Sequence, residues 1–146
     1  MRDINAPLPD TEFWRAYNGR FSGVLKWEDF DALFDRLAAS GGAWFVFDPS
    51  GDAPDAPLDD LAPVLEEARL CVEQVRNRSY CGAVFADDPA NPSFVKVFDP
   101  YKMGGVCGGS DDRVLPRWIF SRLKPDALPL LPEKPAKKGL FARLTG

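Results

Sequence analysis

Apolar residues recur at helical spacing in two stretches of the chain. Residues 27–39 carry apolar side chains every three or four positions, and Ser40-Gly41-Gly42 follows as a helix stop. Residues 61–76 carry a second such stripe, with Pro63 in the first turn, where a missing N–H costs little. A shorter helix is predicted over residues 11–17. The pattern therefore predicts two main helices and one short helix.

Short stretches of aromatic and β-branched residues predict strands at 43–47, 80–85, 94–98 and 117–122. The first is apolar at every position, which favours a central place in its sheet. The second and third flank a turn-rich segment and predict an antiparallel hairpin. The intervening helix would allow the first two strands to run parallel.

This order of elements predicts an α+β domain. We expect a small mixed or antiparallel sheet of about four strands, with the two main helices packed on one face. Residues 1–9 are expected to form an N-terminal arm and residues 10–124 the single domain. Residues 125–146 are expected to form a Pro-rich linker and a short, flexible, basic amphipathic tail.

Two of the predicted strands end in the same three residues. Phe47-Asp48-Pro49 follows the first strand and Phe98-Asp99-Pro100 follows the third, in each case before a turn. An Asp side chain accepts hydrogen bonds within a turn, and Pro stops the strand ladder. We interpret the recurrence as a device for ending strands.

The composition of the chain argues against several classes of function. The chain has 146 residues, a net charge of −4 and 45% apolar residues, which suits one globular domain. It contains no histidine, which excludes Ser-His-Asp and Cys-His nucleophiles and HExxH zinc sites. The sequence pI of about 4.8 argues against general nucleic-acid binding.

The sequence also predicts a compartment. No apolar stretch reaches the length of a transmembrane segment, and Met1 to Asn5 has no apolar signal region. Three cysteines, an odd and sparse set, favour reduced thiols and a cytoplasmic location. Three sulfurs without a Cys-x-x-Cys pair do not predict a metal centre, and no motif predicts a cofactor.

The most distinctive segment is a Gly-rich loop at residues 101–113. Glycines let backbone N–H groups approach an anion or a partner, and nearby bases add positive charge. The candidate binding residues are Lys102, Gly104, Gly105, Cys107, Gly108, Gly109, Arg113 and Arg117. The loop lacks the P-loop ending and the GxGxxG pattern, so it carries no nucleotide signature. The alternative is a flexible connection between strands.

Cysteine chemistry offers another interpretation of this loop. Cys107 lies among glycines and near bases that would depress the pKa of its thiol. Without a histidine to act as base, redox sensing with Cys81 suits it better than nucleophilic catalysis. Cys71 falls in the apolar stripe of a helix and is interpreted as a core residue.

The C-terminal tail is the second candidate interaction segment. A helical turn would separate its apolar residues from its basic ones, as in a short docking segment. The residues concerned are Lys137, Lys138, Leu140, Phe141 and Leu144. The same pattern suits weak contact with an anionic membrane surface, and the alternative is a solubilising, disordered tail.

These observations assign no catalytic residue. The sequence favours a small cytoplasmic accessory or adaptor protein that binds a protein partner through the loop at 101–113 and the tail. The alternative is an anion- or nucleotide-binding protein, or a thiol-dependent enzyme or redox sensor, using the loop around Cys107.

Overall fold

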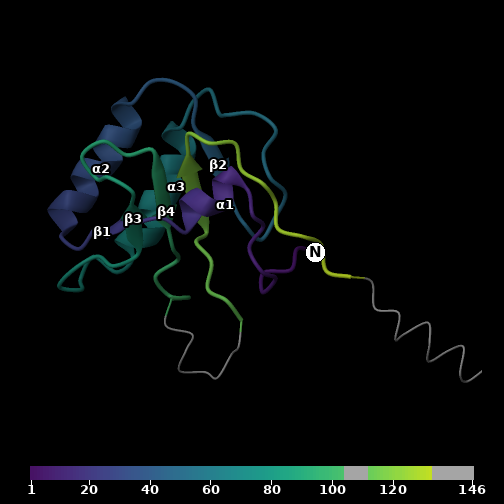
Figure 1. The fold of residues 1–146 in the computed structure, drawn as a ribbon. Helices are drawn as coiled ribbons and strands as arrows, with labels where there is room; N and C mark the ends of the chain where they lie inside the picture. Colours follow the sequence, from purple (N-terminus) through teal and green to yellow (C-terminus); the bar gives the residue numbers. More distant parts are fainter. Residues whose placement is uncertain (104–111, 133–146) are drawn as a thin grey trace, which may run out of the picture.

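The computed structural model describes residues 1–103 and 112–132 and shows an α+β fold (Figure 1). The helices of this part of the chain are α1 (Glu12–Tyr17), α2 (Trp27–Ala39) and α3 (Ala62–Glu73). The strands are β1 (Ser22–Gly23), β2 (Phe45–Phe47), β3 (Val84–Ala86), β4 (Phe94–Val97) and β5 (Trp118–Ser121). The strands form one sheet in the order β1-β3-β4-β5-β2, and every neighbouring pair is antiparallel.

Helices cover both faces of this sheet. On one face, α2 and α3 pack against Val95 and Val97 of β4 and against Trp118 and Phe120 of β5. On the other face, Phe13 and Trp14 of α1 form a second buried cluster; the sheet and a C-terminal segment contribute Phe47, Phe94, Ile119 and Leu128 to it. The fold is therefore a three-layer sandwich, and alternate residues along β4 and β5 enter different cores.

Local sequence explains where the helices begin and end. The Thr11 hydroxyl accepts a hydrogen bond from Trp14 N at the start of α1, which confirms the predicted helix. Helix α2 ends at Ala39, and Gly42 adopts a φ of +85°, a conformation that favours glycine. The Arg122 guanidinium lies over the Trp44 ring and donates to the carbonyls of Gly41 and Ala43, so this turn is held against the sheet.

The strand predictions need three corrections. The sheet has five strands in the described residues, because the two-residue β1 pairs with β3 and is too short to leave a hydrophobic pattern. Strand β2 lies at an edge rather than at the centre; its apolar character reflects the helical layers on both faces. It pairs antiparallel with β5, not in parallel with β3. The β3–β4 hairpin is antiparallel, as predicted.

Helix packing also differs in part from the prediction. The two main helices, α2 and α3, share one face, whereas the short α1 covers the opposite face. Helix α3 ends at Glu73, three residues before the predicted end. None of the helices in the described ranges is long and apolar enough to cross a membrane.

The described N-terminal and C-terminal segments lie side by side (Figure 1). Asp3 N donates to Pro129 O at 2.7 Å, and Leu131 N donates to Met1 O at 2.8 Å. The Trp14 indole N–H donates to Asp126 O, and Leu128 is fully buried beside it. The start of the predicted arm thus pairs with the start of the predicted linker.

Candidate functional site

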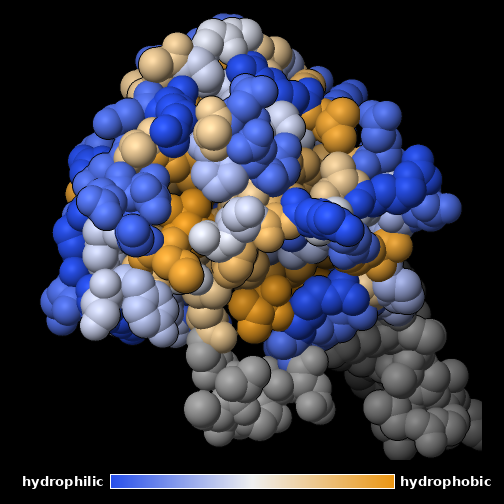
Figure 2. Space-filling view, turned by 60° about the vertical axis from the view of Figure 1, so that its left-hand side comes forward, coloured by the Kyte–Doolittle hydropathy of each residue, from blue (hydrophilic) through white to orange (hydrophobic). Residues whose placement is uncertain are grey.

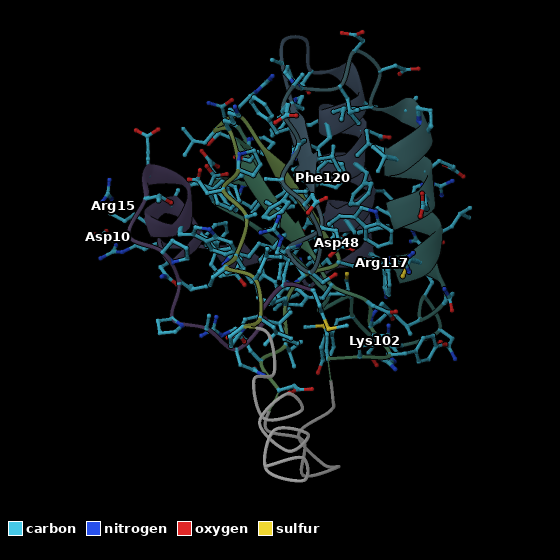
Figure 3. All side chains as sticks on the ribbon, turned by 90° about the vertical axis from the view of Figure 1, so that its right-hand side faces the viewer. Asp10, Arg15, Asp48, Lys102, Arg117 and Phe120 are labelled. Carbon is cyan, nitrogen blue, oxygen red and sulfur yellow. The ribbon has the colours of Figure 1, made fainter. Side chains whose placement is uncertain are left out.

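Sheet topology brings the two Phe-Asp-Pro segments to the same end of the sheet, where β2 and β4 both finish. Strands β2 and β4 both pair antiparallel with β5, which lies between them, so they run in the same direction. Asp48 and Asp99 therefore follow their strands at the same end of the sheet. Strand β5 begins at that end, directly after Arg117. In Figure 3, Asp48 and Arg117 lie near each other, with Lys102 beyond them.

Both aspartates hold the turns that follow their strands. Asp48 Oδ1 accepts hydrogen bonds from the backbone N and the hydroxyl of Ser50, at 3.0 and 2.7 Å. Asp99 Oδ1 accepts from Tyr101 N at 3.0 Å, and Asp99 O accepts from Lys102 N at 2.9 Å. These contacts confirm that the recurring segments end strands by Asp-centred turns.

A hollow of about 320 Å³ opens between these strand ends. We call it the basic hollow; its lining residues are Ile4, Asp48, Ser50, Phe98, Asp99, Lys102, Arg113, Val114, Leu115, Pro116 and Arg117. Three basic residues on two separate segments border an apolar floor. Such a floor with a few polar groups is typical of binding sites.

Basic residues outnumber acidic residues in the described lining of the basic hollow. Both carboxylates accept turn hydrogen bonds, whereas no side-chain ion pair joins Lys102 or Arg113 to another described residue. Arg113 Nη1 is buried and has no hydrogen-bond partner in the described part of the chain. Arg117 lies over the Trp118 ring and 3.6 Å from a Glu67 oxygen, with both side chains about half exposed. Three bases therefore face two acids in the described lining, which leaves a formal excess of one positive charge.

The N-terminal segment positions Arg113. Asn5 Oδ1 accepts from Arg113 N at 2.6 Å, and the Asn5 side-chain amide donates to Asp112 at 3.0 Å. The Arg113 guanidinium also acts on Tyr17: burial raises the pKa of the Tyr17 phenol, and the positive charge opposes that shift. The N-terminal segment thus helps to build the site.

A shallower groove of about 300 Å³ adjoins the basic hollow. We call it the α3 groove; it is lined by Glu67, Leu70, Cys71, Gln74, Asp99, Tyr101, Arg117 and Trp118. Asp99 and Arg117 line both depressions, so the two are continuous. Leu70 and Tyr101 are 55% and 63% exposed, so both side chains present apolar surface to solvent beside the groove. Figure 2 shows another face of the molecule, the left-hand side of Figure 1, where apolar side chains also lie among hydrophilic ones.

The described thiols are buried rather than activated. Burial and the Asp99 carboxylate raise the pKa of the Cys71 thiol, against the opposing charges of Arg117 and Lys102. Cys71 is packed in the main core, as predicted. Burial also raises the pKa of the Cys81 thiol, above its ordinary value. Neither thiol has the lowered pKa that marks a reactive cysteine.

The structure brings together the three predicted basic residues. Lys102, Arg113 and Arg117 all border the basic hollow. The predicted Gly104, Gly105, Cys107, Gly108 and Gly109 lie outside the described residues, as do the tail residues Lys137, Lys138, Leu140, Phe141 and Leu144. The hypotheses that depend on them stay predictions. No group of three or more cysteine, aspartate or glutamate residues in the described ranges is arranged to hold a metal ion.

Several residues of the basic hollow were not identified from the sequence. The sequence pattern assigns Asp48 and Asp99 to turns that end strands, and it places Ile4 in the N-terminal arm. The signal that points to the aspartates is the recurring Phe-Asp-Pro segment, since two strands that run in the same direction finish at the same end of the sheet.

Comparisons with models of known protein families, with curated proteins and with solved structures found no match.

Proposed function

We propose that this protein is a non-catalytic adaptor that recognises an acidic segment of a protein partner at the basic hollow. One observation carries the proposal: Lys102, Arg113 and Arg117 surround one hollow whose described lining has only two acids, and Arg113 Nη1 is buried without a hydrogen-bond partner among the described residues. An acidic side chain in the hollow would compensate these charges. Hydrogen bonds from Arg to a carboxylate are among the stronger ones in proteins.

The surroundings of the hollow favour a polypeptide over a free small anion. The hollow continues into the α3 groove past Arg117, which extends the surface beyond the size of a phosphate. Exposed Tyr101 and Leu70 border this path, and aromatic and arginine side chains are common at protein interfaces. A chain segment can follow such a path, whereas a lone anion would use only the charged part.

A charge-reversal experiment tests the proposal. Lys102 and Arg117 are exposed, so the variant Lys102→Glu/Arg117→Glu alters the hollow without burying a charge. The variant Arg20→Glu/Lys26→Glu makes the same change in net charge at exposed positions outside the hollow and serves as the control. A photo-crosslinking residue at position 114, which lines the hollow, would identify the contacted protein in cells of the source organism by mass spectrometry.

We expect one protein to be crosslinked through an acidic segment. Crosslinking should persist in the control variant and fall at least about tenfold in the hollow variant, because charge reversal replaces attraction by repulsion. Equal crosslinking by both variants would overturn the proposal. Thermal stabilisation of the wild type by phosphate or nucleotides, lost in the hollow variant and without a crosslinked protein, would indicate a small-anion site instead.

A further inference from the structure

The basic hollow and the α3 groove form one continuous surface with two chemical characters. The hollow supplies Lys102 and Arg113, and the groove supplies Leu70, Cys71 and the Tyr101 ring. Arg117 lies between them, since its side chain lines both. From this arrangement we infer that the protein binds a short linear motif of a partner in which an acidic residue lies within three positions of a large apolar residue. This inference rests on the proposed function and specifies the partner's chemistry.

Geometry sets the spacing within the motif. In an extended peptide, side chains two residues apart point to the same side and are separated by about 7 Å. Two depressions that share a wall are adjacent at this scale. The acidic residue would therefore occupy the hollow, and an apolar residue one to three positions away would occupy the groove.

The groove explains why charge alone is insufficient. Glu67 and Asp99 outnumber Arg117 in the groove, so a second acidic residue there would meet an excess of negative charge, whereas the bases of the hollow outnumber its acids. Leu70 is exposed on α3, whereas neighbouring Cys71 belongs to the buried stripe of the helix. An apolar side chain laid over Leu70 and Tyr101 would remove apolar surface from water on both sides.

The alternation of charge and apolar surface gives specificity. A purely acidic segment would satisfy the hollow and be repelled by Glu67 in the groove. A purely apolar segment would leave the excess positive charge of the hollow uncompensated. Only a segment with both characters complements the whole surface, and recognition of such a difference is how an interface rejects competing segments.

Selection from a displayed library of random nonapeptides tests the inference. The bait is the full-length protein, and the Lys102→Glu/Arg117→Glu variant serves for counter-selection. The expected result is enrichment of peptides with Asp or Glu within three positions of Leu, Ile, Phe, Trp or Tyr. Enriched peptides are then synthesised, and their affinities are measured against the wild type and single variants.

Two matched variants separate the groove from the hollow. Leu70→Gln removes the apolar side chain while keeping a good helix former, and Leu25→Gln makes the same change at an exposed position outside both depressions. Leu70→Gln should weaken binding at least about fivefold, a loss that peptides with alanine at the apolar position should not show. Leu25→Gln should leave affinity unchanged.

The outcomes distinguish this inference from the proposed function. Enrichment of acidic peptides with no apolar preference, or affinity unaffected by Leu70→Gln, would overturn the inference and leave the proposed function standing. Recovery of the same peptides by the charge-reversed variant, or of no peptide family at all, would overturn both.

Discussion

Lys96 is a basic residue placed against two aromatic rings on the α1 side of the sheet. Its Nζ lies 3.8 Å from the centre of the Tyr17 ring and 3.9 Å from that of Phe21, and it donates to Tyr17 O at 2.7 Å. The rings and the carbonyl favour the charged amine, whereas removal from water disfavours it. Desolvation prevails and lowers the pKa of Lys96 to about 8.

This shift predicts a pH dependence of stability. The ordinary lysine pKa is 10.5, so between about pH 8 and 10.5 the unfolded chain holds a proton that the folded chain has released. The free energy of unfolding should therefore rise with pH across this window, by about 1–2 kcal/mol after allowance for partial exposure of the amine. The measurement is urea unfolding at several pH values from 7 to 10.5.

The Lys96→Met variant isolates this contribution. It keeps an unbranched side chain between the rings and removes the titrating group. The difference in unfolding free energy between wild type and variant should move in favour of the wild type as pH rises from 8 to 10.5. Parallel pH profiles for the two proteins would show that the Lys96 amine titrates as it does in the unfolded chain.

At the scale of elements, periodicity predicts the long helices well and the position of strands poorly. Helix α2 has its predicted bounds because an apolar stripe, acidic residues in the first turn and a glycine stop all agree. The predicted central position of β2 was wrong because a strand with apolar residues on both faces has the same sequence pattern at the centre of a sheet and at the edge of a sheet that is covered on both faces. Only tertiary packing distinguishes these cases.

Arg76 links the two helices that share a face of the sheet. Its guanidinium forms ion pairs with Asp31 of α2, at 2.5 Å, and with Glu73 of α3. It also lies 4.8 Å from the centre of the Trp27 ring. Since the Arg76 side chain is only about one-third exposed, these contacts are partly shielded from solvent.

Arg76→Ala is therefore expected to lower the unfolding free energy by about 1–2 kcal/mol, because it removes both a cross-helix ion pair and ring contact. Arg69→Ala is the matched control, since the ion pairs of Arg69 with described residues are formed with Glu66 and Glu73 of its own helix. Its effect should be clearly smaller than that of Arg76→Ala, because exposed ion pairs within one helix contribute little to stability. Chemical denaturation of both variants makes the measurement, and equal losses would show that the cross-helix contacts add no stability.

At the scale of the whole molecule, the candidate site is a product of topology. The sequence indicated Lys102, Arg113 and Arg117 because they flank one loop. It did not indicate that the exits of β2 and β4 meet beside them, since their chain separation of 51 residues carries no information about strand order. Pairing of both strands with β5 brings Asp48 and Asp99 to the basic hollow.

The N-terminal and C-terminal segments of the described chain pack together on the α1 side of the sheet, and Asn5 of the N-terminal segment contacts the candidate site. Leu128 is fully buried against the α1 cluster, and the segment around it pairs with residues 1–3, next to the Asn5 whose side chain accepts a hydrogen bond from Arg113 N.

Leu128→Ala should lower the unfolding free energy by about 2–4 kcal/mol through the cavity it leaves. Leu130→Ala, at a position 61% exposed in the same segment, should change it by less than about 0.5 kcal/mol. Urea unfolding of both variants measures the difference. A loss for Leu128→Ala as small as that for Leu130→Ala would show that the C-terminal segment does not contribute to the folded core.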